Sequence, residues 1–229
     1  MYKAVFIDLD DTLWDFHANA RISLQEMYTN RGLNRHFDSF DEFFEIYAKR
    51  NIELWESYGK GEITKDYLML ERFRYPLSRM GVDDLELAHE IGHQYLEILP
   101  TQKTLMPHAL EVLDYLKERY SLTIISNGFT EVQYKKLKSS GLAHYFNHVV
   151  LSEQAGALKP DPRIFTHALH LNDVEAHEAI MIGDSYEADI RGAQASGIDQ
   201  VYFPLHGNAK PHQTATYRID SLKELMQIL

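Results

Sequence analysis

The sequence predicts an α/β fold in which a doubly wound parallel sheet is interrupted, after its first strand, by a helical insertion. Short apolar runs of strand length alternate with helical patterns over the second half of the chain, as they do in βαβ units. The runs are almost continuously apolar, which is typical of parallel strands buried on both faces. Between the first and the second run, a long stretch has helical spacing only.

The strands and helices of the sheet follow from these runs. Strands are expected at residues 2–9, 122–126, 148–152, 179–183 and, more briefly, 200–203. Apolar side chains at helical spacing predict the helices between them: Leu110, Leu113 and Leu116; Val132, Tyr134 and Leu137; Ile164, Phe165, Ala168 and Leu169; and Ala188, Ile190, Ala193 and Ala195. Gly141 and Gly197 follow the second and the fourth of these patterns, where glycine commonly ends a helix.

The inserted segment covers residues 15–99 and contains no clear strand pattern. Its apolar residues recur at helical spacing in three groups: Phe40, Phe43, Phe44 and Tyr47; Leu68, Phe73 and Leu77; and Leu85, Ala88, Ile91, Leu96 and Leu99. We therefore expect a helical domain at residues 15–99 and a core domain made of residues 1–14 and 100–229.

Composition restricts the function classes. With 45% hydrophobic and 25% charged residues, the chain has the makeup of a globular protein. Its formal net charge of −11 argues against binding a nucleic-acid polymer, whereas a local cation could still recruit a small phosphorylated metabolite. The absence of cysteine excludes disulfides, a thiol nucleophile and thiolate metal ligands. Without a long apolar run or a signal peptide, we expect no membrane association, a cytoplasmic location, and a monomer or small homo-oligomer.

Polar residues gather where the predicted strands end. Ligands of open α/β sheets bind beyond the carboxyl ends of the strands. The residues expected on that rim are Asp8 and Asp10, Ser126, Asn127 and Gly128, Lys159, and Asp184 with Asp189. Several carboxylates on one rim require a cation, and oxygen ligands alone favour a hard ion, most commonly Mg²⁺. An aspartate beside such an ion can attack phosphorus, and a second carboxyl group can transfer the proton.

These segments, in this order, resemble the four motifs of the haloacid dehalogenase superfamily of phosphatases: "DLDDT", "SNG", "KP" and "GDSYEAD". The resemblance implies a Rossmann-like core, an aspartyl-phosphate mechanism and a helical cap that closes over the cleft. It makes Asp8 the nucleophile and a metal ligand, and Asp10 the acid/base that also binds metal through its carbonyl. Ser126 and amides near Asn127 and Gly128 would hold the phosphoryl group. Lys159 would neutralise the charge of Asp8 and of the phosphate, and Asp184 would bind the metal. Asp189 would either bind the metal itself or lie beside the residues that do.

The inserted segment bears a closer resemblance to one branch of this superfamily. "ELWESYGKGEITKDYL" and "RFRYPLSRMGV" are similar to the cap of house-cleaning pyrimidine 5′-nucleotidases. This implies a nucleoside 5′-monophosphate substrate, with Trp55 and Tyr58 either in the cap core or stacked on the base. A sugar phosphate or phosphoglycolate remains the alternative, for which Arg50, Lys60 and Lys65 could supply charge. His108 departs from the pattern, since many relatives have glycine after the preceding proline.

Parts of the sequence are also compatible with two other classes of function. "HEIGH" matches the zinc-peptidase pattern H-E-x-x-H, with His89 and His93 as ligands and Glu90 as base. Gly92 weakens that helix, and no further motif supplies a third ligand. A non-catalytic binding module is disfavoured because every residue that the phosphatase chemistry needs is present. An acidic residue at position 10 also favours phosphate esters, because the resemblance to dehalogenases and phosphonatases fails there.

Overall fold

The computed structural model describes residues 1–205 and 214–229. The chain divides into two compact units. One, here called the core unit, consists of Met1–Phe16 and Lys103–Leu229, and the other, the helical unit, is His17–Gln102. Among the described residues, no helix is both long enough and apolar enough to span a bilayer.

Strands and helices of the core unit alternate along the chain. Its strands are β1 (Ala4–Ile7), β2 (Ser121–Ser126), β3 (His148–Leu151), β4 (Ala179–Gly183), β5 (Asp199–Tyr202) and β6 (Tyr217–Arg218). Its helices are α5 (Ala109–Lys117), α6 (Thr130–Ser139), α7 (Ser152–Ala155), α8 (Pro162–Asn172), α9 (Arg191–Ala195) and α10 (Leu225–Ile228). A π-helical turn, Tyr186–Ile190, precedes α9.

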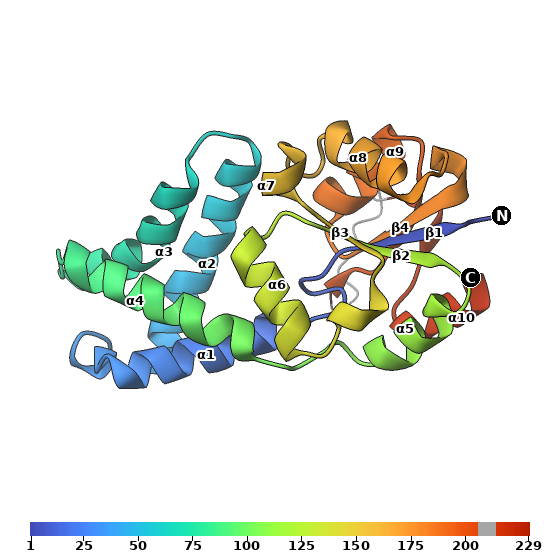
Figure 1. Ribbon diagram of the computed structural model, residues 1–229. Helices are drawn as coiled ribbons and strands as arrows, with labels where there is room; N and C mark the ends of the chain where they lie inside the picture. The colour runs from blue at the N-terminus through green and yellow to red at the C-terminus, as the bar shows by residue number, and fades with distance from the viewer. Residues whose placement is uncertain (206–213) are drawn as a thin grey trace. The chain divides into compact units, whose positions relative to one another are not determined.

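The six strands form one parallel sheet in the order β3-β2-β1-β4-β5-β6. Helices α8 and α9 cover one face, and α5 and α10 lie on the other (Figure 1). The chain starts in the middle of the sheet, builds outward to β3 and then returns to the other side of β1. This confirms the predicted doubly wound α/β fold. The order in which strands are added to the sheet reverses at β1, and such sheets bind ligands at that point.

Burial on both faces explains why the strands are apolar throughout. All four residues of β1 and all five of β4 are buried. Between the sheet and α8, Phe6, Phe165 and Met181 share one hydrophobic cluster with no exposed surface. Gly192 completes the packing on α9, because a Cβ there would lie 2.6 Å from the ring of Phe165. The sheet is therefore anchored from both sides, which fixes the positions of its strand ends.

The helical unit contains α1 (Phe16–Asn30, whose first residue belongs to the core unit), α2 (Phe40–Gly59), α3 (Lys65–Arg79) and α4 (Leu85–Ile98). Ser39, Thr64 and Asp84 cap the last three by accepting a hydrogen bond from a backbone N–H of the first turn. Aromatic rings hold the helices together; Tyr47 stacks on Phe73 with a centroid separation of 5.2 Å.

Some predicted apolar faces were wrong in detail. Leu85, Leu110 and Tyr134 are 52%, 45% and 45% exposed, although each was assigned to a buried stripe. In α6 the buried face instead includes Gln133 and Lys136. Polar residues on a buried face shift the apparent stripe by one or two positions, which is why periodicity misassigned Tyr134. The two-residue strand β6 was not predicted either, because its residues, Tyr217 and Arg218, are exposed and too few to show a pattern.

His108 adopts a backbone conformation that glycine usually supplies. Its φ of 68° and ψ of 5° lie in the left-handed region, directly before α5. The imidazole Nδ1 lies 3.0 Å from Glu111 Oε2 in the first turn of that helix. An L-residue in this conformation costs roughly 1–2 kcal/mol, so the departure from glycine noted in the sequence is a source of local strain.

Replacing His108 should therefore change stability in opposite directions for two variants. His108→Gly relieves the strain, but glycine also raises the entropy of the unfolded chain, which offsets part of the gain. We therefore expect it to stabilise the fold by up to about 1 kcal/mol. His108→Val should destabilise it by about 1–2 kcal/mol. Both variants lose the contact with Glu111, so chemical denaturation of the pair isolates the backbone term. Equal stability of the two variants would show that the conformation is not strained.

Candidate active site

The carboxyl end of β1 lies between those of β2 and β4, and all three strands deliver polar residues to one place. Asp8 follows β1, Ser126 is the last residue of β2, and Asp184 follows β4. The backbone N–H of Asp8 donates to Ile182 O of β4 at 2.9 Å, which ties the first of these residues to the neighbouring strand. The strand ends thus bring together side chains that are up to 176 positions apart in the sequence.

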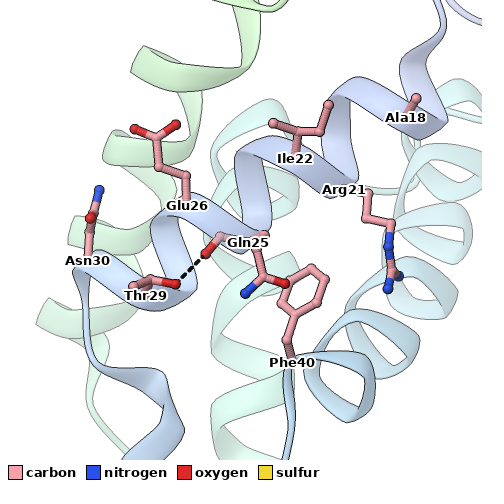
Figure 2. A pocket seen from close by; sticks show the side chains of 8 residues that line it. All are labelled: Ala18, Arg21, Ile22, Gln25, Glu26, Thr29, Asn30 and Phe40. Carbon is pink, nitrogen blue, oxygen red and sulfur yellow. Dashed lines mark hydrogen bonds between the residues drawn. The ribbon is translucent and has the colours of Figure 1, made fainter.

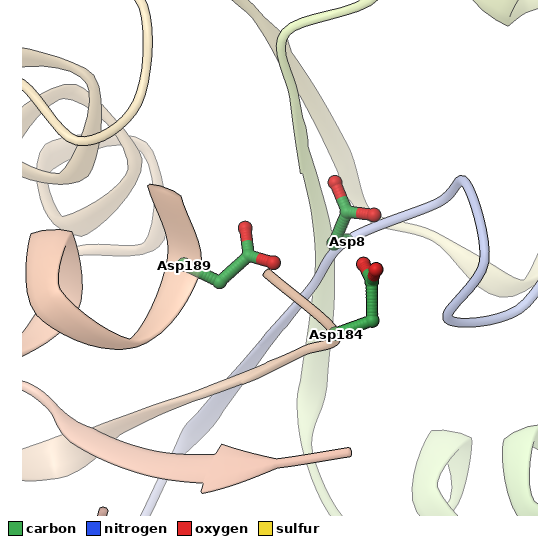
Figure 3. A group of neighbouring side chains, drawn as sticks. All are labelled: Asp8, Asp184 and Asp189. Atoms are coloured by element: carbon green, nitrogen blue, oxygen red, sulfur yellow. The ribbon is translucent and has the colours of Figure 1, made fainter. Parts of the chain in front are cut away.

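Three carboxylates converge there. Asp8, Asp184 and Asp189 each offer an oxygen within 4.8 Å of the others, and their side chains point toward one another (Figure 3). Asp8 and Asp189 are 7% and 0% exposed, and Asp184 is half-buried. Among residues 1–205 and 214–229, this is the one group of three or more potential ligands close enough to hold a metal ion.

Lys159 supplies the single positive charge inside this group. Its ammonium group donates to Asp8 Oδ1 at 2.5 Å, to Asp189 Oδ1 at 2.6 Å and to the backbone oxygen of Ile125 at 2.8 Å. All three of its hydrogens are thereby used, and the residue is 3% exposed. Asp8 Oδ2 receives no hydrogen bond from the described residues and remains open to a ligand.

The charges in this group do not balance. Three carboxylates against one ammonium leave an excess of two negative charges in a buried place. Burial raises the pKa of Asp8 to about 7; Lys159 opposes the shift, and Asp189 and Asp10 add to it. Burial and the neighbouring carboxylates of Asp189 and Asp8 also raise the pKa of Asp184. Burial lowers the pKa of Lys159, but Asp189 and Asp8 outweigh it, so that its pKa lies above the usual value and the lysine stays charged.

Asp189 is held in place by local geometry. It belongs to the π-helical turn after β4, and its Oδ2 accepts a hydrogen bond from the backbone N–H of Ser185 at 3.0 Å. Gly183 makes room for it, because a Cβ at that position would collide with the Asp189 carboxylate. Both oxygens of Asp189 therefore have protein donors, Ser185 and Lys159, and the residue orients the lysine.

Asn127 and Ser126 form the second side of the site. The Asn127 amide pairs with the backbone of Lys159, accepting from its N–H at 2.7 Å and donating to its carbonyl at 2.9 Å. This locks the lysine loop to the end of β2. Ser126 Oγ accepts from the backbone N–H of Gly128 at 3.1 Å and from Gln133 Nε2 at 2.7 Å. Since both partners donate, the hydroxyl hydrogen of Ser126 is left to donate to a ligand.

Two residues that bind Asp10 were missed by the sequence analysis. Lys136 donates to Asp10 Oδ1 at 2.6 Å, and Gln133 Nε2 donates to Asp10 Oδ2 at 2.9 Å. Both lie on the buried face of α6, and Lys136 is 3% exposed. The available signal was their i, i+3 spacing beside Val132 and Leu137, which puts two polar residues on an apolar helix face.

The donor set fits a hard divalent cation. Every side chain of the carboxylate group offers oxygen, and a charge of +2 matches the excess of two negative charges. Within the described part of the chain, Asp8 and Asp184 keep oxygens without a strong donor, since the one donor to Asp184 Oδ1 there is the Thr12 hydroxyl at 3.4 Å. The Asp10 side chain, in contrast, is occupied by Lys136 and Gln133.

The other predicted residues lie in the helical unit. Trp55 and Tyr58 are half-buried, and their rings meet edge-on with centroids 5.7 Å apart. His89 and His93 are exposed, Glu90 pairs with Arg31 at 2.5 Å, and His93 lies beside Glu97. Gly92 is explained by packing, because a Cβ there would lie 3.3 Å from the ring of Phe73. None of this supports a zinc site.

The helical unit also contains a surface hollow. Figure 2 shows it beside α1, lined by Ala18, Arg21, Ile22, Gln25, Glu26, Thr29, Asn30 and Phe40. Arg21 is paired with Asp41 at 2.5 Å and lies over the ring of Phe40, so its charge is already balanced. The hollow contains none of the residues predicted to be functional.

Comparison with known proteins gives consistent results. The pyrimidine 5′-nucleotidase YjjG of Escherichia coli is 31% identical, over 98% of this chain and 96% of its own length. A glyceraldehyde 3-phosphate phosphatase of Pyrococcus abyssi is 33% identical over 89% of this chain and 82% of its own. The HAD-hydrolase YfnB of Bacillus subtilis is 29% identical over 100% of this chain and 95% of its own length. Its crystal structure with bound magnesium superposes with a TM-score of 0.88, at 28% identity and with 100% and 98% coverage.

The family is established by a match over most of the chain. The model of the haloacid dehalogenase-like hydrolases matches residues 2–197, which include every residue of the carboxylate group, Lys159 and the end of β2. The chain is therefore an enzyme that belongs to the haloacid dehalogenase-like hydrolases.

Proposed function

We propose that the protein is a Mg²⁺-dependent phosphatase that hydrolyses small phosphate monoesters through a phosphorylated Asp8. Its substrates would be nucleoside 5′-monophosphates, with pyrimidine forms preferred. The observation that carries this proposal is the convergence of Asp8, Asp184 and Asp189 beside Lys159, in which one oxygen of Asp8 receives no hydrogen bond from the described residues.

In the first step, a carboxylate oxygen of Asp8 attacks phosphorus as the bond from phosphorus to the ester oxygen breaks. Asp10 gives its proton to the leaving oxygen, which departs as an alcohol. Lys159 neutralises Asp8 and the phosphoryl oxygens, and Ser126 donates its hydroxyl hydrogen to one of them. Mg²⁺, bound by Asp8, Asp184 and the Asp10 carbonyl oxygen, would supply further charge stabilisation for the phosphoryl group.

In the second step, water attacks the phosphorus of phosphorylated Asp8. Asp10 accepts a proton from that water, the bond between Asp8 and phosphorus breaks, and inorganic phosphate is released. Both residues thus return to their starting forms. No single group accounts for the acceleration that phosphate-monoester hydrolysis requires, so Lys159, Ser126 and the cation must act together on the phosphoryl oxygens.

The substrate class rests on the relatives and on the helical unit. YjjG is named a pyrimidine 5′-nucleotidase, and we propose Trp55 and Tyr58 as contacts for the nucleoside. An aromatic contact of this kind is worth about 1–3 kcal/mol per stacked base. The Pyrococcus relative supports the alternative of a sugar phosphate. Arg50 is a weak candidate for that role, because its guanidinium group already binds Glu53 at 2.9 Å and Glu71 at 3.5 Å.

Asp8→Asn should abolish turnover without unfolding the protein. The change keeps the shape of the side chain but removes the nucleophile, so kcat should fall by at least about 10³-fold. Steady-state kinetics with a monophosphate substrate and a circular dichroism spectrum are the measurements. Substantial activity in Asp8→Asn protein free of wild-type enzyme would rule out Asp8 as the nucleophile.

Asp10→Asn and Asp184→Asn should separate catalysis from metal binding. Asp10 would bind Mg²⁺ through its carbonyl oxygen, which asparagine keeps, so Asp10→Asn should lower kcat by about 10²–10⁴-fold with little loss of affinity. Asp184→Asn removes an anionic ligand and should weaken Mg²⁺ binding by at least about tenfold. Calorimetric titration of both variants with Mg²⁺ tests this. Equal losses of affinity would mean that the Asp10 carboxylate is itself a ligand.

Mg²⁺ binding should depend on pH through Asp8. The pKa of its carboxyl group in the folded, metal-free protein is about 7, above the 3.8 of an ordinary aspartate. The stabilising contribution of the protonated form is therefore fully present below pH 3.8 and is lost as the pH rises through 7. Because Mg²⁺ must displace this proton, affinity should fall by about tenfold per pH unit below 7.

The control for this pH dependence is Asp8→Asn, which has no proton to displace at position 8. Titrations between pH 5.5 and pH 8.5 should show a shallower dependence in the variant than in the wild type. An affinity that is constant across this range in the wild type would contradict the assignment of Asp8 as an ionised metal ligand.

A substrate panel tests the proposed specificity. With Mg²⁺, kcat/KM should be highest for dUMP, dTMP and UMP, lower for AMP, and lowest for phosphoglycolate and hexose phosphates. A pocket sized for a pyrimidine should reject a purine by its volume. If the sugar phosphates lead by tenfold or more, corresponding to about 1.4 kcal/mol in transition-state binding, the nucleotidase assignment is wrong and only the phosphatase assignment remains.

A further inference from the structure

We propose that Gln133 and Lys136 are positioning residues, which hold the Asp10 carboxyl group in the orientation for proton transfer to and from the reacting oxygen. This inference rests on the proposed function, because it assumes that Asp10 is the acid and base of a phosphatase. It assigns a catalytic purpose to the buried face of α6.

The contacts of Asp10 define its orientation completely. Lys136 binds one oxygen at 2.6 Å and Gln133 the other at 2.9 Å. Two donors on different oxygens fix both side-chain torsions of an aspartate, which a single hydrogen bond would leave mobile. Each oxygen keeps a second lone pair, so one can carry the transferable proton while Lys136 still donates to the other.

Lys136 is placed specifically for this contact. Its ammonium group is buried, has Asp10 as its one carboxylate partner among the residues that the structure describes, and lies 4.5 Å from the centroid of the Trp14 ring. Trp14 ends the same loop that carries Asp10, and it closes that loop through a hydrogen bond from its N–H to Leu9 O at 2.9 Å. Burying a lysine is costly unless the charge is paired, so this side chain holds the loop at both Asp10 and Trp14.

Gln133 connects the proposed acid to the phosphate-binding residue. Its amide nitrogen donates both to Asp10 and to Ser126 Oγ, at 2.9 Å and 2.7 Å. Its Oε1 is buried and has no partner among the described residues, which identifies the two donated hydrogens as the reason for its placement. Gly128 leaves the necessary space, because a Cβ there would lie 2.5 Å from the Gln133 amide.

The experiment compares two substrates of nearly the same size, phenyl phosphate and 4-nitrophenyl phosphate. The nitrophenolate leaves without a proton, whereas the phenolate depends much more on an acid. In the holoenzyme with Mg²⁺, Lys136→Met should lower kcat/KM for phenyl phosphate by about 10²-fold and for 4-nitrophenyl phosphate by less than about threefold. Lys136→Arg keeps a cationic donor and should recover most of the loss.

Two further variants make the test specific. Lys135→Met, an exposed position on the same helix, should leave both values unchanged. In an Asp10→Asn background, Lys136→Met should have no additional effect, because residues that act through one another are not additive. If Lys136→Met does not fold, as judged by its melting curve, Lys136→Gln, which also removes the charge, provides the same comparison.

The outcomes separate the inference from the function on which it rests. A loss that is equal for the two aryl phosphates would mean that Lys136 binds phosphate or only supports the fold, and it would overturn the inference. No loss for either substrate would do the same. A wild-type protein that hydrolyses neither these esters nor any nucleotide with Mg²⁺ would instead refute the proposed function.

Discussion

One buried lysine beside a group of three carboxylates is the interaction on which the rest of this structure depends. Lys159 binds Asp8, Asp189 and the end of β2 at once, so it joins three strand ends through a single ammonium group. The single positive charge of Lys159 does not balance the three carboxylates. In the metal-free protein, burial and the neighbouring carboxylates raise the pKa of Asp8 to about 7, so that a bound proton offsets part of the excess negative charge. A divalent cation would supply the same two charges and leave Asp8 ionised and nucleophilic.

The topology of the sheet makes this interaction possible. Parallel strands direct their carboxyl ends to one edge, and the central position of β1 puts Asp8 between β2 and β4. Close packing then removes the remaining freedom: Gly183 admits the Asp189 carboxylate, and the Asn127 amide fixes the backbone of Lys159. The hydrophobic contacts under the sheet thus hold the charged groups at distances that they would not keep in water.

The sequence was sufficient for the fold and for the carboxylates, since apolar runs, strand ends and motif order are all local signals. It was insufficient for Gln133 and Lys136, which act on Asp10 across more than 120 positions. Periodicity treats such residues as errors in an apolar stripe, and it assigned Tyr134 to the face that they occupy. The left-handed backbone at His108 was indicated only by the resemblance, in which many relatives have glycine there, because a histidine by itself does not signal that conformation.

We expect a divalent cation to complete the charge of the group formed by Asp8, Asp184, Asp189 and Lys159. Crystals of the protein grown at pH 8 with Mn²⁺ in place of Mg²⁺ test it most directly, because anomalous scattering locates the ion. We expect one ion at about 2.1 Å from carboxylate oxygens of Asp8 and Asp184 and from the Asp10 carbonyl oxygen. Lys159 should keep its contact with Asp189. Saturating Mn²⁺ with no anomalous density in this group, or with density between His89 and His93 instead, would contradict the account.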